Sequence, residues 1–235
     1  MNAFPHALDA SRPVQVGLVV LQADETIEAD LRRLMPAEIE LLVTRVPSGE
    51  AVTPETLGAM GGVLSAAAGL LPKGARLAAV GYGCTSGTAQ IGAERVAGLL
   101  RAACGAPAAT DPLSALVDEC RRRGWTRLAL LSPYVAPVSE RLRAALGAQG
   151  IATPVFGSFE VSEEARVARI DGASILAAAE ALAVQGGTDA TFLSCTNLRT
   201  LDVLGPIEAR TGRPALSSNL VLATHLCRLA GRPEA

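Results

Sequence analysis

Two stretches of this chain repeat each other at one fixed spacing. The shift that places Cys84 on Cys195 also places Thr85 on Thr196, and it aligns the segment 16–34 with the segment 127–145. A single spacing that aligns separate blocks of sequence is typical of a protein built from similar units. We therefore expect two similar lobes related by a pseudo-twofold axis, each carrying one of these two cysteines at an equivalent position.

Short apolar runs alternate with longer amphipathic segments in both halves of the chain. Continuous runs rich in Val and Leu are typical of strands buried on both faces, and their alternation with helices predicts an α/β fold of parallel sheets flanked by helices. The expected strands are 14–21, 39–46, 76–82, 127–132, 152–159, 190–194 and 214–217. The expected helices are 25–35, 54–70, 89–103, 112–123, 136–149, 172–185, 199–211 and 219–230.

The same pattern suggests how the chain is divided. Residues 1–13 are expected to form a disordered leader. The first α/β lobe is expected at 14–110 and the second at 111–235, lengths that suit small domains. This boundary is approximate, because the helices in the middle of the chain and at its C-terminus could cross from one lobe to the other.

The two repeated cysteines lie in polar loops. Cys84 belongs to GYGCTSGT at 81–88, and Cys195 belongs to LSCTN at 193–197. Each follows an expected strand and precedes an expected helix, which is where open α/β sheets bind ligands. The loops after the strands at 14–21 and 127–132 end at the same edge. These four loops supply the candidate site: Cys84 and Cys195 as reacting groups, and Gln22, Asp24, Thr85, Ser86, Tyr134, Thr196 and Asn197 as substrate contacts.

Two of these candidates have a second interpretation. Asp24 could serve only as the cap of the helix expected at 25–35, and Tyr134 could serve only as a packing residue. The other three cysteines, Cys104, Cys120 and Cys227, lie in helical patterns and are expected to be buried as small apolar side chains.

Two facing thiols can rearrange a small molecule without a metal or an organic cofactor. Unpaired N–H groups at a helix start favour a thiolate, and nearby hydroxyl groups and glycine amides can bind a carboxylate. One thiolate can remove an α-proton while the opposite thiol returns a proton on the other face, which is racemisation. Alternatively, a thiolate adds to an activated double bond, the bond rotates and the sulfur leaves. The sequence offers no Walker loop, no GxGxxG motif after its first strand and no clustered metal ligands, so no cofactor is expected.

The composition narrows the range of partners. The chain carries 21 basic and 23 acidic residues, a balance that argues against a nucleic-acid-binding surface. It has no uninterrupted apolar stretch of ~18 residues that would span a membrane and no recognisable signal peptide. Five cysteines without a CxxC pair are typical of free thiols in a cytoplasmic protein. The expected partner is therefore a small-molecule carboxylate, and a homo-oligomer is left open.

These motifs resemble the aspartate/glutamate racemase superfamily, in the branch that holds maleate cis-trans isomerase and arylmalonate decarboxylase. The resemblance runs over about residues 14–230 and rests on GYGCTSGT, on SPYVAPVSERL at 132–142 and on LSCTNL at 193–198. Within the branch, VLQADETIEADLRRL is most similar to the racemase-like proteins of ectoine utilisation. The resemblance implies two α/β lobes with one thiol from each facing a shared cleft, and catalysis without a cofactor.

Two comparisons within the branch refine this expectation. Arylmalonate decarboxylases keep a single catalytic cysteine at the position matching Cys195, with glycine at the other, so the pair here favours a racemase or an isomerase over a decarboxylase. Maleate isomerases carry a Ser-Asn pair in the first loop, where this chain has Gln22-Ala23-Asp24. A carboxylate there disfavours a dianion and favours a cationic nitrogen. The resemblance therefore implies an amino-acid-like or ectoine-derived substrate.

Three alternatives stay open beside this cofactor-independent racemase or isomerase. The first is a maleate cis-trans isomerase, which converts maleate to fumarate, and the second is an arylmalonate-type decarboxylase. The third is a non-catalytic module that binds a small carboxylate between its lobes. A thiol reagent separates enzyme from module, because a catalytic pair is expected to include a reactive sulfur that the ligand protects.

Overall fold

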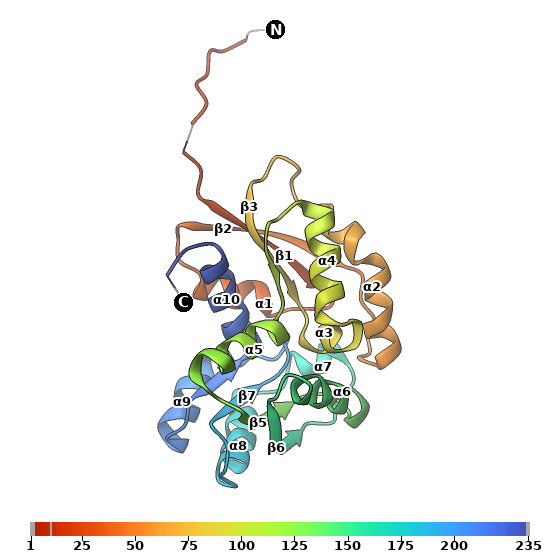
Figure 1. The fold of residues 1–235 in the computed structure, drawn as a ribbon, viewed down its shortest axis with the longest axis vertical. Coiled ribbons are helices and arrows are strands. Elements are labelled where there is room, and N and C mark those ends of the chain that lie inside the picture. The colour runs from red at the N-terminus through yellow and green to blue at the C-terminus, as the bar shows by residue number, and fades with distance from the viewer. Residues whose placement is uncertain (1–2, 10, 234–235) are drawn as a thin grey trace.

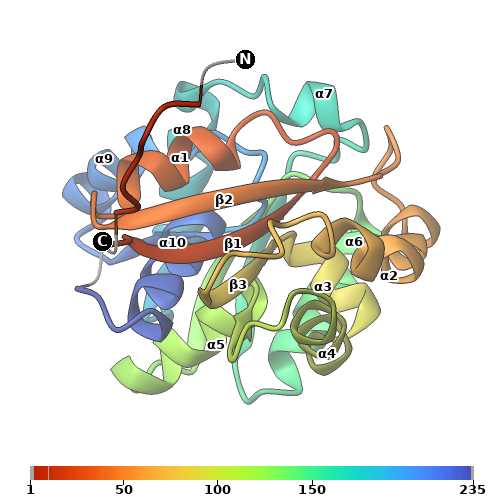
Figure 2. The ribbon, with the colours of Figure 1, turned by 90° about the horizontal axis from the view of Figure 1, so that it is seen from above.

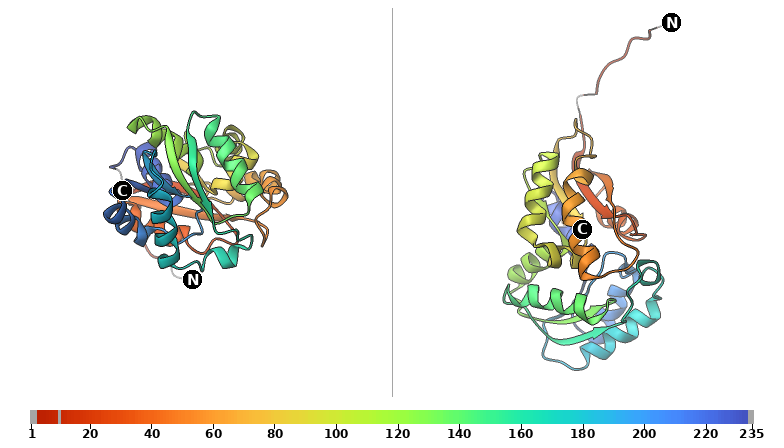
Figure 3. Two further views of the ribbon diagram at one scale, coloured as in Figure 1. Left: turned by 90° about the horizontal axis from the view of Figure 1, so that it is seen from below. Right: turned by 90° about the vertical axis from the view of Figure 1, so that its right-hand side faces the viewer.

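The computed structural model describes residues 3–9 and 11–233, which form two stacked lobes (Figures 1 and 3). The upper lobe of Figure 1 holds a parallel sheet in the order β2-β1-β3-β4. Its strands are β1 (Val14–Leu21), β2 (Ile39–Val46), β3 (Leu77–Gly83) and β4 (Ala109–Thr110). The lower lobe holds a parallel sheet in the equivalent order β6-β5-β7-β8, formed by β5 (Arg127–Ser132), β6 (Ala152–Ser158), β7 (Ala190–Leu193) and β8 (Ala215–Ser217). The expected α/β fold of two similar lobes is confirmed.

Helices cover both faces of each sheet. The helices are α1 (Ile27–Leu34), α2 (Pro54–Ala68), α3 (Thr85–Ile91), α4 (Ala93–Cys104), α5 (Pro112–Arg123), α6 (Ala136–Gly147), α7 (Glu164–Val167), α8 (Gly172–Ala183), α9 (Leu201–Thr211) and α10 (Ser218–Leu229). Side-chain caps define the N-termini of several helices. Asp111 precedes Pro112 and accepts a hydrogen bond from the Ser114 N–H group at 2.9 Å, and Thr53 forms a capping box with Thr56. Such caps fix where each helix leaves its loop.

Two helices cross between the lobes. Helix α5 follows the last strand of the first lobe, yet its Leu116 packs with Leu130 of β5 in the second lobe. Helix α10 follows the last strand of the second lobe, and its Leu222 packs with Leu18 of β1 in the first. Figure 2 shows α10 against the sheet formed by β1, β2 and β3. The two crossing helices also contact each other, so the cores of the lobes are interlocked.

Three elements differ from the sequence-based expectation. The single helix expected at 89–103 is two helices, because Gly92 has a φ of 99° and ends α3 before α4 begins. The short strand β4 and the one-turn helix α7 were not expected. Neither is long enough to carry a hydrophobic period, since β4 has 2 residues and α7 has 4.

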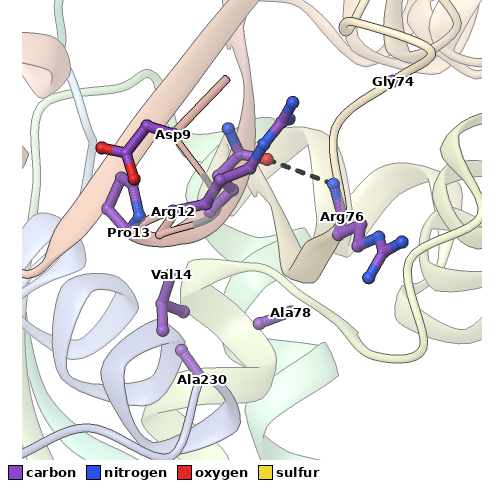
Figure 4. A pocket seen from close by; sticks show the side chains of 9 residues that line it. Asp9, Arg12, Pro13, Val14, Gly74, Arg76, Ala78 and Ala230 are labelled. Carbon is purple, nitrogen blue, oxygen red and sulfur yellow. Dashed lines mark hydrogen bonds between the residues drawn. The ribbon is translucent and has the colours of Figure 1, made fainter. Parts of the chain in front are cut away.

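The expected leader at 1–13 is only partly described, since residues 1–2 and 10 lie outside the described residues. Its described residues are exposed and form neither helix nor strand. A hollow of about 670 Å³ lies between this stretch and the amino ends of β1 and β3, where Arg76 donates its backbone N–H group to Gln15 (Figure 4). The two repeated cysteines follow the opposite, carboxyl ends of strands. In the described part of the chain, no helix is both long and apolar enough to cross a membrane.

Candidate active site

Cys84 directly follows β3 and forms the N-cap of α3. The Gly87 N–H group donates to its Sγ at 3.1 Å, and the Ser86 hydroxyl lies 3.7 Å from the same sulfur. A Cβ atom on Gly87 would lie 2.9 Å from this sulfur and 2.7 Å from the Tyr82 hydroxyl. Glycine at this position therefore lets the amide approach the sulfur.

Cys195 follows β7 but does not lie at a helix start, which corrects the expectation that this cysteine, like Cys84, stands at a helix N-terminus; the helix expected at 199–211 is present as α9. Helix α9 begins only at Leu201, and Cys195 itself has a φ of 109°, a conformation rarely adopted by non-glycine residues. Its Sγ accepts the Asn197 N–H group at 3.3 Å and lies 2.7 Å from the Tyr134 hydroxyl. A turn and a tyrosine, rather than a helix end, hold this sulfur.

Hydrogen bonds join the two cysteine loops directly. The Thr85 hydroxyl lies 2.7 Å from the Ser218 hydroxyl, which accepts the Cys195 N–H group at 3.0 Å. The Thr196 hydroxyl donates to the carbonyl of Gly83 at 3.1 Å. The Cys84 loop thus contacts Ser218, which is a partner of Cys195, and the Cys195 loop contacts the residue that precedes Cys84. Both sulfurs belong to one buried cluster with Tyr134. Ser218 was not singled out in the sequence, because it lies inside the helix start SSNL without any motif.

Glu164 is the site residue that sequence reasoning missed most clearly. Its carboxylate accepts the Tyr134 hydroxyl at 3.5 Å and the Asn197 side-chain amide at 2.8 Å, and it is only 4% exposed. It opens helix α7, which the first lobe holds in place: Glu164 donates its N–H group to Glu50 at 3.1 Å, and Val52 donates to Ser162 at 2.7 Å. No sequence signal distinguishes this glutamate from its exposed neighbour Glu163.

The two candidate residues of the loop after β1, Gln22 and Asp24, differ in burial. Gln22 is exposed, whereas Asp24 is buried and its Oδ1 accepts the N–H groups of Thr26 and Ile27 at 2.8 and 2.9 Å. Its Oδ2 is buried without a hydrogen-bond partner. The nearby Thr196 hydroxyl donates to the carbonyl of Gly83, and its proximity to Asp24 lowers the pKa of that carboxyl. Asp24 therefore shapes the turn into α1 with one oxygen and leaves the other free beside the Cys195 loop.

Burial dominates the protonation of both thiols. Cys84 is 3% exposed and Cys195 is 2% exposed. Burial raises the pKa of Cys84 to about 12 and raises the pKa of Cys195 well above its usual value, and the charge of Glu164 adds to both increases. The expectation of thiolates stabilised at helix starts is therefore wrong for these buried sulfurs, since lost hydration outweighs the hydrogen bonds of Gly87 and Tyr134.

The two carboxyl groups of the site also have altered pKa values. Burial raises the pKa of Glu164 to about 7, with a further increase from the charge of Asp24 and a decrease from the Asn197 donor. Burial raises the pKa of Asp24, and the N–H groups of Ile27 and Thr26 partly offset that increase. Among the described residues, no three His, Cys, Asp or Glu side chains are grouped to hold a metal ion. The site thus offers two thiols, a phenol and two carboxyl groups for proton transfer or nucleophilic attack.

Residues 16–235 match the arylmalonate decarboxylase family, Amdase. An arylmalonate decarboxylase from Bordetella bronchiseptica is 32% identical over 227 residues, which cover 94% of this chain and 92% of that protein. A maleate isomerase from Nocardia farcinica is 31% identical over 122 residues, which cover 52% of this chain and 48% of that protein. The fold is similar to that of a Nocardia farcinica maleate cis-trans isomerase variant with a covalently bound succinylcysteine intermediate, with a TM-score of 0.84, 26% identity and 94% of each chain covered. The chain therefore belongs to the arylmalonate decarboxylase family.

Proposed function

We propose that this protein is a cofactor-independent isomerase that uses Cys84 and Cys195 on a small carboxylate. The observation that carries the proposal is the pair of buried thiols on equivalent loops, joined through Thr85, Ser218 and Thr196. In racemisation, one thiolate removes the α-proton, the electron pair stays on the carbanion, and the opposite thiol donates its proton to the other face. The first sulfur ends as a thiol and the second as a thiolate, so no oxidant or cofactor is consumed.

The first loop favours a substrate that carries a cationic nitrogen beside its carboxylate. Asp24 is 5% exposed and its Oδ2 lacks a hydrogen-bond partner. A second substrate carboxylate placed near this oxygen would meet a like charge in a poorly hydrated site, whereas an ammonium or amidinium group would gain a charged hydrogen bond. Amino acids and ectoine-derived compounds have this combination of charges.

The proposal is tested by a substrate screen in deuterated water. Free amino acids, ectoine-derived compounds, maleate and an arylmalonate are incubated with the protein and followed by proton NMR and chiral chromatography. Racemisation is expected to exchange the α-hydrogen for deuterium and to produce the opposite enantiomer. A protein that binds these compounds but converts none of them is a binding module, and the isomerase proposal is then wrong.

The same screen distinguishes racemisation from two other reactions of the family, because each reaction gives a different product. Maleate cis-trans isomerisation is favoured by the similarity to the Nocardia farcinica enzyme and its succinylcysteine intermediate. It would yield fumarate, which proton NMR distinguishes from maleate. Decarboxylation is favoured by the similarity to the Bordetella bronchiseptica protein along nearly the whole chain, and it would release carbon dioxide from the arylmalonate. Efficient turnover of maleate or arylmalonate would replace the racemase interpretation.

Replacing Asp24 with asparagine is expected to shift the preference from amino-acid-like substrates toward maleate by about tenfold or more, which corresponds to ~1.4 kcal/mol. The amide oxygen can still accept the N–H groups of Thr26 and Ile27, so the turn is kept. The measurement is kcat/KM, or Kd, for both ligand types. Glu25→Gln is the matched control, because that side chain is 43% exposed and pairs with Arg169 at the surface. An unchanged preference in Asp24→Asn would leave Asp24 with a turn-forming role alone.

A further inference from the structure

We infer that the hydroxyl group of Tyr82 is a hydrogen-bond donor to the thiolate form of Cys84. Tyr82 belongs to the GYGCTSGT motif, but the site described above does not use it. The inference rests on the proposed isomerase function, in which Cys84 is a thiolate at one stage of every racemisation, and it adds a residue to that mechanism.

Tyr82 and Cys84 meet beside Gly87. A Cβ atom built on Gly87 would lie 2.7 Å from the Tyr82 hydroxyl oxygen, 2.9 Å from Cys84 Sγ and 3.2 Å from Met60 Cε. Because these three atoms surround one point, the phenol, the thiol and the thioether are neighbours. Tyr82 lies in β3 and is 0% exposed, so its hydroxyl group is shielded from solvent.

The acceptor that the Tyr82 hydroxyl has in this structure is a weak one. The hydroxyl donates to Met60 Sδ at 3.4 Å, and the direction is defined because a thioether has no hydrogen to give. A buried tyrosine hydroxyl usually has a stronger acceptor. A thiolate at Cys84 would supply one, and the hydroxyl hydrogen can turn toward it about the C–O bond while the O–H bond stays intact.

The charges around Cys84 do not stabilise a thiolate. The titratable groups that act on this sulfur are Glu164 of α7, Tyr82 of β3 and Tyr134 after β5, and Asp111 before α5 acts on Tyr82. None of these four groups is cationic, and the carboxylate of Glu164 opposes a negative charge on the sulfur. Stabilisation of the thiolate therefore depends on hydrogen-bond donors.

Tyr82 completes a set of three donors at Cys84. The Gly87 N–H group lies 3.1 Å from the sulfur and the Ser86 hydroxyl lies 3.7 Å from it, both on α3. Burial raises the pKa of Cys84 to about 12, and the donors of Gly87, Ser86 and Tyr82 each act to lower it. Tyr82 is the member of this set that comes from the strand rather than the helix.

The placement of the tyrosines supports this assignment. The chain has two tyrosines, and each lies beside one of the two thiols. The Tyr134 hydroxyl lies 2.7 Å from Cys195 Sγ, and the Tyr82 hydroxyl lies beside Cys84 at Gly87. Tyr82 precedes its cysteine in β3, whereas Tyr134 follows β5, so the two lobes bring a phenol to each sulfur from different positions.

The test is the initial rate at which iodoacetamide alkylates Cys84 at mildly alkaline pH, read by mass spectrometry for each cysteine separately. In Tyr82→Phe, Cys84 is expected to react about tenfold more slowly, because its thiolate loses a charged hydrogen bond. Cys195 in the same samples is the internal control and is expected to keep its rate. Thermal unfolding is expected to change little, since the lost contact is a weak bond to Met60. Turnover of the substrate is expected to show a kcat about tenfold lower with a similar KM.

Met60→Leu is the matched second variant, because leucine has a similar volume but accepts no hydrogen bond. Its Cys84 is expected to react at least as fast as in the unmodified protein, since the Tyr82 hydroxyl has then lost its present acceptor. An unmodified rate at Cys84 in a folded Tyr82→Phe protein would overturn the inference, and so would an equal slowing of Cys84 and Cys195. Slower alkylation in Met60→Leu would also overturn it, even where Tyr82→Phe fails to fold. Failure of the proposed function is distinct: no carboxylate is then turned over, while the alkylation rates still test Tyr82.

Discussion

Replacing either Cys84 or Cys195 with serine is expected to lower turnover by at least ~10²-fold, the usual scale for a lost acid–base group. A serine hydroxyl is a far weaker acid than a thiol, and burial already raises the pKa of both thiols. The fold is expected to survive, because the side chains are nearly isosteric and the Gly87 and Asn197 N–H groups can donate to an oxygen instead. Steady-state kinetics on each purified variant, with thermal unfolding as a check of the fold, make the measurement.

Cys104→Ser is the matched control for this experiment. Cys104 is half-buried in α4 and donates to the carbonyl of Leu100 at 3.2 Å, a contact that a serine hydroxyl can keep. Its substitution is expected to leave turnover unchanged. Near-wild-type activity in Cys84→Ser or Cys195→Ser would remove that cysteine from the mechanism.

Glu164→Gln is expected to stabilise the protein above pH 7 by up to roughly 3 kcal/mol, because a pKa that differs by one between the folded and unfolded states corresponds to about 1.4 kcal/mol. The pKa of Glu164 rises from 4.5 to about 7 on folding. Between these values the folded protein binds more protons than the unfolded chain, so its free energy of unfolding falls as pH rises. The advantage of the neutral glutamine is therefore absent below about pH 4.5, grows through this window and is complete above about pH 7.

Urea unfolding at a series of pH values measures this difference directly. Glu163→Gln is the control, because its carboxylate is 56% exposed and its loss is expected to change stability little at any pH. A Glu164→Gln variant that is less stable than the unmodified protein at pH 8 would contradict the prediction. A stability gain accompanied by a loss of turnover would indicate that the buried carboxylate is kept for chemistry rather than for folding.

The sequence predicts the elements that carry a repeating pattern. The strands β1 and β5 and the cysteine loops that follow β3 and β7 are visible because buried parallel strands are continuous apolar runs, and because the CT motif occurs in both lobes. Two loops far apart in sequence could be placed together because the carboxyl ends of parallel strands share an edge.

The missing parts of the site depend on contacts that no local pattern encodes. Glu164 reaches Tyr134 and Asn197 because residues 50–52 of the first lobe hold residues 162–164 of the second by backbone hydrogen bonds. Ser218 belongs to the site because its hydroxyl, at the start of α10, accepts a hydrogen bond from the N–H group of Cys195 in the loop after β7. The direction in which the thiol pKa values move also depends on tertiary structure, since a helix start predicts a decrease and only the final burial shows that desolvation is larger.

The exchange of α5 and α10 between the lobes has a consequence for how the chain is made. The first lobe is synthesised early, but one face of its sheet, around Leu18 and Val20, is covered by Leu222 and Leu226 near the other end of the chain. On the ribosome, that apolar face stays bare until α10 has emerged, and α5 in turn awaits Leu128 and Leu130 of β5. The core of the first lobe therefore cannot be completed before the chain has been synthesised as far as α10, and until then the first lobe exposes apolar surface.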